Sequence, residues 1–116
     1  MNMENIKRGE IYWVNWQPAR ESEQSGHRPA LVVQNDVGNR LGPTVIVAAC
    51  TTAIGKSYPF LVPISTQESG LPKNSAINLS QILTIDKARL ESKCGELTQE
   101  KMLTVDKALK LSLWLE

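Results

Sequence analysis

The most constraining feature of the sequence is an unbroken apolar run at residues 45–50, inside the β-prone segment Thr44–Thr51. A short apolar run between turn-forming residues is typical of a strand that is buried on both faces. A membrane span needs about 20 apolar residues, so this run is too short to cross a bilayer. The sequence therefore predicts a buried strand in a folded domain with no membrane partner.

Further short strands are expected on both sides of this run. Alternating β-prone side chains predict a strand over residues 9–16, and a second strand over residues 29–34 begins with Pro29, where a missing N–H costs little. Residues 35–39 have the composition of a turn. Shorter strands are expected at residues 58–64, 75–78, 82–84 and 89–96. Spacing of this kind is typical of a small barrel or sandwich.

The last segment predicts a helix. Thr98 can cap it, because its side chain can accept a hydrogen bond from the first turn. The apolar residues at helical spacing are expected to pack in the core, and they are Met102, Val105, Leu109 and Leu113. The length of 116 residues matches a single domain, 1–116. The predicted fold is mainly β with a C-terminal α-helix, a small antiparallel barrel with the helix packed on it.

Charge and cysteine content limit the possible partners. The sequence has 13 Lys and Arg against 12 Asp and Glu, a net charge of +1, so any contact with nucleic acid must be local. Cys50 and Cys94 lack C-x-x-C spacing, and we interpret them as reduced core side chains of a cytoplasmic protein. The N-terminus does not have the pattern of a signal peptide. Two Cys and one His are too few for a structural zinc site, so no metal and no cofactor are expected.

Polar side chains that could carry chemistry gather in residues 21–29 and in Thr51 and Thr52 at the end of the apolar run. Cleavage of RNA by its own 2′-OH needs a proton acceptor, a proton donor and fixed positive charge at the phosphorus. Arg28 could bind two phosphate oxygens with its planar guanidinium. Because His27 is the one histidine, Glu23, His27 or Arg28 would share the proton transfers, or a second copy would contribute. Taken separately, these residues also have simpler interpretations. A histidine in a loop is often solvated, and an arginine at the start of a strand is often part of a surface ion pair. Thr51 and Thr52 are common in β-strands without any further role.

Several segments together resemble the MazF/PemK toxin family, in order from Lys7 to the final helix. They are Arg8-Gly9-Glu10-Ile11-Tyr12, Gly26-His27-Arg28-Pro29-Ala30-Leu31-Val32, Cys50-Thr51-Thr52 with Tyr58-Pro59-Phe60, and Gln81-Ile82-Leu83-Thr84-Ile85-Asp86-Lys87. The resemblance implies an SH3-like barrel of the PemK/CcdB toxin type that forms a homodimer. It also implies a metal-independent, sequence-specific endoribonuclease toxin that cleaves single-stranded RNA and leaves a 2′,3′-cyclic phosphate and a 5′-OH. A cognate, MazE-like antitoxin would occlude the active groove.

The resemblance also assigns residues to roles. Arg28 matches the catalytic arginine and Thr51 the catalytic threonine, while Glu23 matches a loop glutamate with an acid–base role in some members, and His27 stands beside them. The residues expected to contact RNA are Ser22, Gln24, Thr52, Ser75 and Gln81. Many members have glycine where this chain has Glu21. If that position requires a positive φ, the glutamate strains the loop and changes the sequence at which RNA is cut.

Two other functions remain open at this point. One is a non-enzymatic toxin of the same fold that poisons a protein target such as DNA gyrase, since such toxins depend on a tryptophan near the C-terminus and Trp114 is at that place. Packing of Trp114 in the core or in a dimer explains it more simply, because Leu113 precedes it on the predicted helix. The other is an inactive homologue that binds antitoxin alone.

Overall fold

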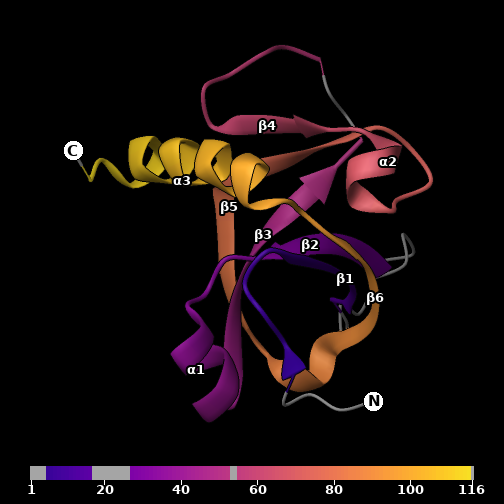
Figure 1. Ribbon diagram of the computed structural model, residues 1–116, viewed down its shortest axis with the longest axis vertical. Coiled ribbons are helices and arrows are strands. Elements are labelled where there is room, and N and C mark those ends of the chain that lie inside the picture. Colours follow the sequence, from indigo (N-terminus) through magenta and orange to yellow (C-terminus); the bar gives the residue numbers. More distant parts are fainter. Residues whose placement is uncertain (1–4, 17–26, 53–54, 116) are drawn as a thin grey trace.

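The computed structural model describes residues 5–16, 27–52 and 55–115. One antiparallel sheet contains the six strands of these residues in the order β4-β5-β3-β2-β1-β6 (Figure 1). The strands are β1 (Glu10–Asn15), β2 (His27–Val32), β3 (Thr44–Thr51), β4 (Leu61–Ile64), β5 (Ser75–Asp86) and β6 (Leu90–Glu96). The helices are α1 (Asp36–Leu41), α2 (Thr66–Ser69), the 3-10 turn η2 (Lys87–Arg89) and α3 (Gln99–Leu113).

The predicted class, mainly β with a C-terminal helix, is confirmed. Within the described residues the sheet keeps two edges, β4 and β6, and does not close into a complete barrel. Among the helices of the described residues, none is long and apolar enough to cross a membrane. The sheet, rather than the helices, therefore positions most of the side chains considered below.

Two apolar clusters cover the two faces of β3, as the run at residues 45–50 predicts. The helix-side cluster consists of Ile11, Leu31, Val33, Ala48, Cys50, Val62, Ile64, Leu71, Ile77, Leu79, Leu97, Met102, Val105 and Ala108. The strand-side cluster consists of Ile6, Tyr12, Val14, Ala30, Val32, Val45, Val47, Ile85 and Leu90. Ala48 and Cys50 belong to the first cluster and Val45 and Val47 to the second, because successive residues of a strand point to opposite faces.

Helix α3 begins as predicted and ends differently. Thr98 is its N-cap, and its side chain accepts a hydrogen bond from the backbone N–H of Lys101. Met102, Val105 and Ala108 are buried against β4 and β5, but Leu113 is 52% exposed, so its predicted place in the core is wrong. Figure 1 gives the reason, since the C-terminal end of α3 extends past the strands that its first turns cover.

Two local predictions from turn residues are also corrected. Residues 35–39 form the start of α1 rather than a turn, with Asn35 as its N-cap accepting a hydrogen bond from the backbone N–H of Gly38. Asparagine is favoured in both settings because its side chain can replace a backbone acceptor. The strands expected at residues 75–78 and 82–84 are one strand, β5, whose pairing with β3 shifts register between Ala48 and Cys50.

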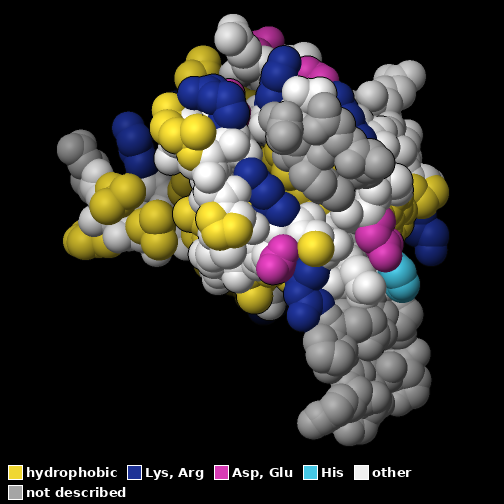
Figure 2. Space-filling view, turned by 90° about the horizontal axis from the view of Figure 1, so that it is seen from below, with side chains coloured by type: hydrophobic (Ala, Val, Ile, Leu, Met, Phe, Trp, Pro, Cys, Tyr) yellow, Lys and Arg dark blue, Asp and Glu magenta, His cyan; other side chains and the backbone are white. Residues whose placement is uncertain are grey.

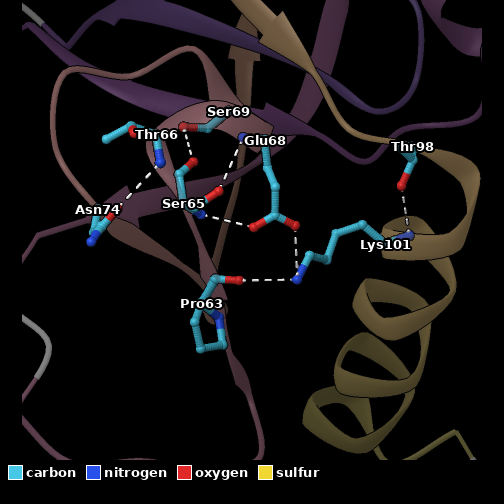
Figure 3. Close-up of polar contacts among 8 residues, drawn as sticks. All are labelled: Pro63, Ser65, Thr66, Glu68, Ser69, Asn74, Thr98 and Lys101. Carbon is cyan, nitrogen blue, oxygen red and sulfur yellow. Dashed lines mark hydrogen bonds and ion pairs between the residues drawn. The ribbon is translucent and has the colours of Figure 1, made fainter.

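The short helix α2 was not expected from the sequence, and side-chain contacts hold it in place (Figure 3). Ser65 and Glu68 form a capping box, in which each side chain accepts a hydrogen bond from the other's backbone N–H. Glu68 also pairs with Lys101 of α3 at 3.0 Å. Gly70 ends the helix at φ +80, and an added Cβ there would overlap the carbonyl oxygen of Cys94 on β6. A glycine is therefore required where α2 meets β6.

Candidate active site

Arg28 is the second residue of β2, and its side chain is exposed. It lies opposite Val14 of β1 in the antiparallel register. No hydrogen bond or ion pair links its guanidinium to the rest of the described chain. An exposed guanidinium with five unused donors is suited to an external anion such as phosphate.

Thr51 ends β3 and is half-buried, and its backbone pairs with Ala76 of β5. On its other side, β3 pairs with β2 through Ala49 and Ala30. The same register, continued by two residues on each strand, brings Thr51 opposite Arg28. Both side chains then leave the sheet on the face of the strand-side cluster, because Ala30 of that cluster lies two residues from Arg28. The structure thus brings these two predicted residues to one face of neighbouring strands.

His27 begins β2 and contacts an acidic residue that sequence reasoning missed. Its Nδ1 lies 2.7 Å from Oε1 of Glu91, which follows the first residue of β6. The pair is accessible, with 53% and 39% of the two side chains exposed. Because His27 and Arg28 are consecutive in the strand, their side chains leave the sheet on opposite faces. The sequence holds no local signal for this pair, since 64 positions separate its members.

The remaining predicted site residues differ in their exposure, and several lie outside the described residues. Thr52 is exposed immediately after β3, and Gln81 is exposed on β5. Ser75 is 3% exposed and its hydroxyl donates to the carbonyl oxygen of Lys73, so its burial argues against direct contact with RNA. The predicted residues Ser22, Glu23 and Gln24, and Glu21 beside them, lie outside the described residues.

The groups near this face differ in the chemistry that they can support. Burial raises the pKa of Cys50, which precedes Thr51, to about 12, so this thiol stays protonated and is not a nucleophile. In the described part of the chain, no three His, Cys, Asp or Glu side chains form a group that could hold a metal ion. On the face seen in Figure 2, Lys and Arg side chains are scattered among apolar and acidic ones. The arrangement therefore suits a local contact with one or two phosphates, through Arg28 and the Thr51 hydroxyl.

Comparison with known proteins places the chain among toxins of one family. The family described as PemK-like, MazF-like toxin of type II toxin-antitoxin system matches residues 7–113. Endoribonuclease EndoA of Bacillus subtilis (strain 168) is 49% identical over 109 residues, which cover 93% of this chain and 94% of that protein. Endoribonuclease MazF of Staphylococcus epidermidis is 47% identical over 111 residues, covering 95% and 92% of the two chains.

Solved structures agree with these matches. An endoribonuclease in complex with its cognate antitoxin, from a mycobacterial species, aligns with a TM-score of 0.79 at 26% identity and covers 96% of this chain and 97% of that one. MazF of Deinococcus radiodurans aligns with a TM-score of 0.73 at 24% identity, covering 94% and 96%, which shows a shared fold.

Proposed function

Because the chain belongs to the PemK-like, MazF-like toxins of type II toxin–antitoxin systems, we propose that it is an endoribonuclease that cleaves single-stranded RNA. The observation that carries the proposal is the near-full-length identity of 47–49% to two proteins named endoribonucleases. The site agrees with it, since the exposed guanidinium of Arg28 has no hydrogen-bond partner among the described residues and lies on the same face as Thr51. A sequence-specific cut also requires unpaired bases, whose edges are exposed in single-stranded RNA.

The reaction that these groups suit is attack by the 2′-OH of RNA on the adjacent phosphorus. A base removes the 2′-OH proton, the bond from O2′ to phosphorus forms, and the bond from phosphorus to O5′ breaks. The leaving O5′ takes a proton, so the products are a 2′,3′-cyclic phosphate and a 5′-OH. Arg28 would stabilise the charge that develops on the phosphorane, and Thr51 would hydrogen-bond the phosphate. Glu23 and His27 are the candidates for moving protons, and neither metal nor cofactor takes part in these steps.

The partners of this activity are part of the proposal. A cognate, MazE-like antitoxin would bind the toxin, in keeping with the solved complex of a related endoribonuclease. The chain would act as a homodimer in the cytoplasm, where its RNA substrate is found. The large apolar side chains exposed on and after α3 are a surface that a second copy could cover, and they are Leu103, Leu111, Leu113, Trp114 and Leu115. Light scattering of the purified chain measures the mass directly.

The exposure of Trp114 contradicts one of the two kinds of packing expected for it, the one in the core. Trp114 is 83% exposed and adopts the left-handed conformation that ends α3, so it does not pack in the core. Exposure alone also fits the gyrase-poison alternative. The relatives named endoribonucleases favour cleavage of RNA, and we therefore keep gyrase as an arm of the test.

The decisive experiment incubates the purified toxin with a long defined transcript in the presence of EDTA. We expect discrete fragments whose 5′ ends carry hydroxyl groups and whose 3′ ends carry cyclic phosphates. Sequencing these 5′ ends identifies the recognition sequence. In parallel, the same preparation is added to a gyrase supercoiling assay, where no inhibition is expected. Intact RNA together with inhibited gyrase would overturn the proposed function.

A further inference from the structure

A groove beside the C-terminal helix is lined by leucines that are open to solvent. It has a volume of about 740 Å³ and runs along α3 as far as Arg8. Leu103 and Leu115 line it with 66% and 55% of their surfaces exposed, and Leu109 is half-buried against the helix-side cluster. Large apolar side chains gathered in one concavity are typical of a surface that binds another molecule.

The charged residues of the groove are mostly cations. Arg8, Lys107 and Lys110 line it, and Asp106 is the acidic residue among the described part of the lining. Asp106 is already paired, because its Oδ1 lies 2.7 Å from a guanidinium nitrogen of Arg8. Lys107 and Lys110 are exposed and form no ion pair with the described part of the chain. The groove therefore presents two unpaired ammonium groups beside its leucines.

The groove follows one side of α3. Lys107 and Lys110 stand four and seven residues after Leu103, a spacing that puts the three side chains on the same face of a helix. A ligand that lies along this face would meet leucine and lysine side chains together. It must offer apolar groups to the leucines and negative charge to the lysines.

RNA satisfies only the second of these requirements. Its phosphates would pair with the lysines, but its bases stack on aromatic rings or on guanidinium planes. The described lining of the groove contains no aromatic ring, and the guanidinium of Arg8 already donates to Asp106 and to the carbonyl oxygen of Val33. The leucines would stay uncovered, so a protein segment fits the groove better.

A second copy of the chain also fits poorly. A copy that shared the groove across a twofold axis would bring Lys107 and Lys110 towards the same two lysines, and like charges facing each other disfavour the contact. Leu111, Leu113 and Trp114 lie outside the groove and stay available to a second copy. The groove is suited instead to a partner segment that carries apolar and acidic side chains together.

The groove is remote from the candidate active site. Nε of Arg8 donates to the carbonyl oxygen of Val33, just after the end of β2, whereas Arg28 is the second residue of that strand. Five residues of extended chain separate Val33 from Arg28, which is about 16 Å. Helix α3 packs on β4 and β5 over the helix-side cluster, while Arg28 and Thr51 face the strand-side cluster. A ligand confined to the groove would leave these two side chains uncovered.

We propose that the groove beside α3 is a docking site for an acidic segment of the cognate antitoxin. Its apolar side chains would contact the leucines, and its carboxylates would pair with Lys107 and Lys110. The inference rests on the antitoxin partnership of the proposed function and adds a contact that is separate from the RNA site. Charges at the rim guide association, and the apolar side chains that become buried supply most of the affinity.

The test measures the Kd of the purified cognate antitoxin for the toxin and for two groove variants. The double variant Lys107→Glu and Lys110→Glu reverses the charge of the rim, and Leu103→Ser removes an apolar contact. We expect each to raise this Kd by about 10-fold or more. Both should cleave RNA at the parental rate in the absence of antitoxin, and circular dichroism verifies that they fold.

Arg40→Glu and Leu41→Ser are the matched controls, because they change an exposed cation and an exposed leucine on α1, outside the groove. Both should keep the parental Kd for antitoxin. If charge reversal unfolds the toxin, the double variant Lys107→Gln and Lys110→Gln replaces it, and it should raise the Kd by a smaller factor, about threefold.

Overlapping peptides of the antitoxin then locate the docked segment. They are tested on toxin that is saturated with an uncleavable RNA, a short strand that spans the mapped cut site and carries 2′-deoxyribose at the attacking position. We expect a peptide with apolar and acidic residues to bind in the presence of this RNA and to lose affinity for both groove variants. A peptide that RNA displaces, or one that binds both variants as tightly as the parent, would contradict a separate site.

The possible failures can be told apart. If the parent does not cleave RNA, the proposed activity is wrong, and the Kd for antitoxin still tests the groove. Parental antitoxin affinity in both folded groove variants would overturn the docking site and leave the activity standing. Weaker RNA binding by the lysine variants would assign the groove to RNA, and a lower mass of Leu103→Ser in light scattering would assign it to a second copy. Either result would overturn the proposal.

Discussion

Nδ1 of His27 and Oε1 of Glu91 lie 2.7 Å apart, so that a carboxylate from β6 holds the imidazole at the start of β2. An ionised carboxylate can only accept, and Nδ1 therefore donates the proton of this hydrogen bond. In the neutral ring this tautomer carries its proton on Nδ1, and the side chain leaves β2 on the face opposite to that of Arg28 and Thr51. The pair gives His27 a fixed orientation that a solvated loop residue would not have.

If His27 moves a proton in RNA cleavage, His27→Ala should lower kcat by about 100-fold, within the range for general acid–base catalysis. Glu91→Ala should lower kcat less, by about 10-fold, because it removes only the orientation. In the double variant the loss should equal that of His27→Ala alone, since both changes act through one group. Single-turnover cleavage of RNA measures these rates.

Glu96→Ala is the matched control, because Glu96 is another exposed carboxylate of β6 and pairs with Lys93 rather than with His27. It should cleave at the parental rate. Parental cleavage by His27→Ala would contradict a role for His27 and leave the proton transfers to Glu23.

Arg28→Ala should lower the rate of cleavage by about 100- to 1,000-fold or more, the range seen when one donor to a transition-state oxyanion is removed. Arg40→Ala serves as control, since Arg40 is an exposed arginine on α1 without a side-chain ion pair among the described residues. Circular dichroism of both variants verifies folding. A folded Arg28→Ala toxin that cuts RNA as fast as the parent would refute the site.

RNA affinity should depend only modestly on salt. The chain carries a net charge of +1, so few phosphates can be neutralised at once. The slope of log Kd against log salt reports that number, at about 0.7 per contact for a single strand. Titration of the uncleavable RNA at 50–300 mM salt, roughly the range in which such slopes are measured, should give two to four contacts as an order-of-magnitude value. A slope near 8 would contradict a local contact.

The sequence predicts an element best where its residues fit one kind of structure and no other. β3 is found at Thr44–Thr51 as predicted, because only a strand in the middle of the sheet can bury successive apolar residues on both faces. Turn-forming residues predicted the structure less well. Asn35 is the N-cap of α1, and its side chain accepts the same kind of backbone hydrogen bond there that it would accept in a turn. Leu113 continues an apolar stripe, yet it is 52% exposed, because the end of α3 extends past the strands that its first turns cover, and the length of the sheet is a property of the whole fold.

The residues of the candidate site also differ in whether the sequence alone could point to them. Arg28 and Thr51 stand beside polar segments of the sequence, but the resemblance to the MazF/PemK family, rather than this pattern, assigned them their roles. Glu91 could not be singled out, since its significance depends on the pairing between strands that brings it beside His27. The burial of Ser75 was equally hidden, because it depends on the pairing of β5 with β4 and not on the residue's immediate neighbours in sequence.

Gly70→Ala should destabilise the fold strongly. The added methyl group would meet the carbonyl oxygen of Cys94, and φ +80 is unfavourable for an L side chain. Backbone strain of this kind costs about 1–3 kcal/mol before the clash is counted. Urea denaturation measures the loss, and Gly55→Ala is the control, because an added Cβ at Gly55 would meet open space. Equal stability of the two variants would show that α2 does not approach β6 so closely.

The stability of the toxin should fall in acid partly through Glu68. Its carboxylate accepts a hydrogen bond from the backbone N–H of Ser65 at 2.8 Å and pairs with Lys101 at 3.0 Å (Figure 3). The hydrogen bond from the Ser65 N–H, followed by the pairing with Lys101, lowers the pKa of Glu68 below its ordinary value of 4.5. A carboxyl whose folded pKa is lowered stabilises the fold above its unfolded pKa, and this contribution disappears as the pH falls through the folded pKa.

Glu68→Gln should therefore reduce the free energy of unfolding at pH 7 and should flatten its decline below about pH 4.5. The effect should be small, under about 1 kcal/mol, because the pair is more than a third exposed on the Glu68 side. Urea denaturation at a series of pH values between 7 and the acid limit of folding gives both quantities. Glu100→Gln, on the first turn of α3 and without a side-chain partner among the described residues, should keep the parental slope. A parental acid profile in Glu68→Gln would show that α2 is held by its backbone contacts and not by this carboxylate.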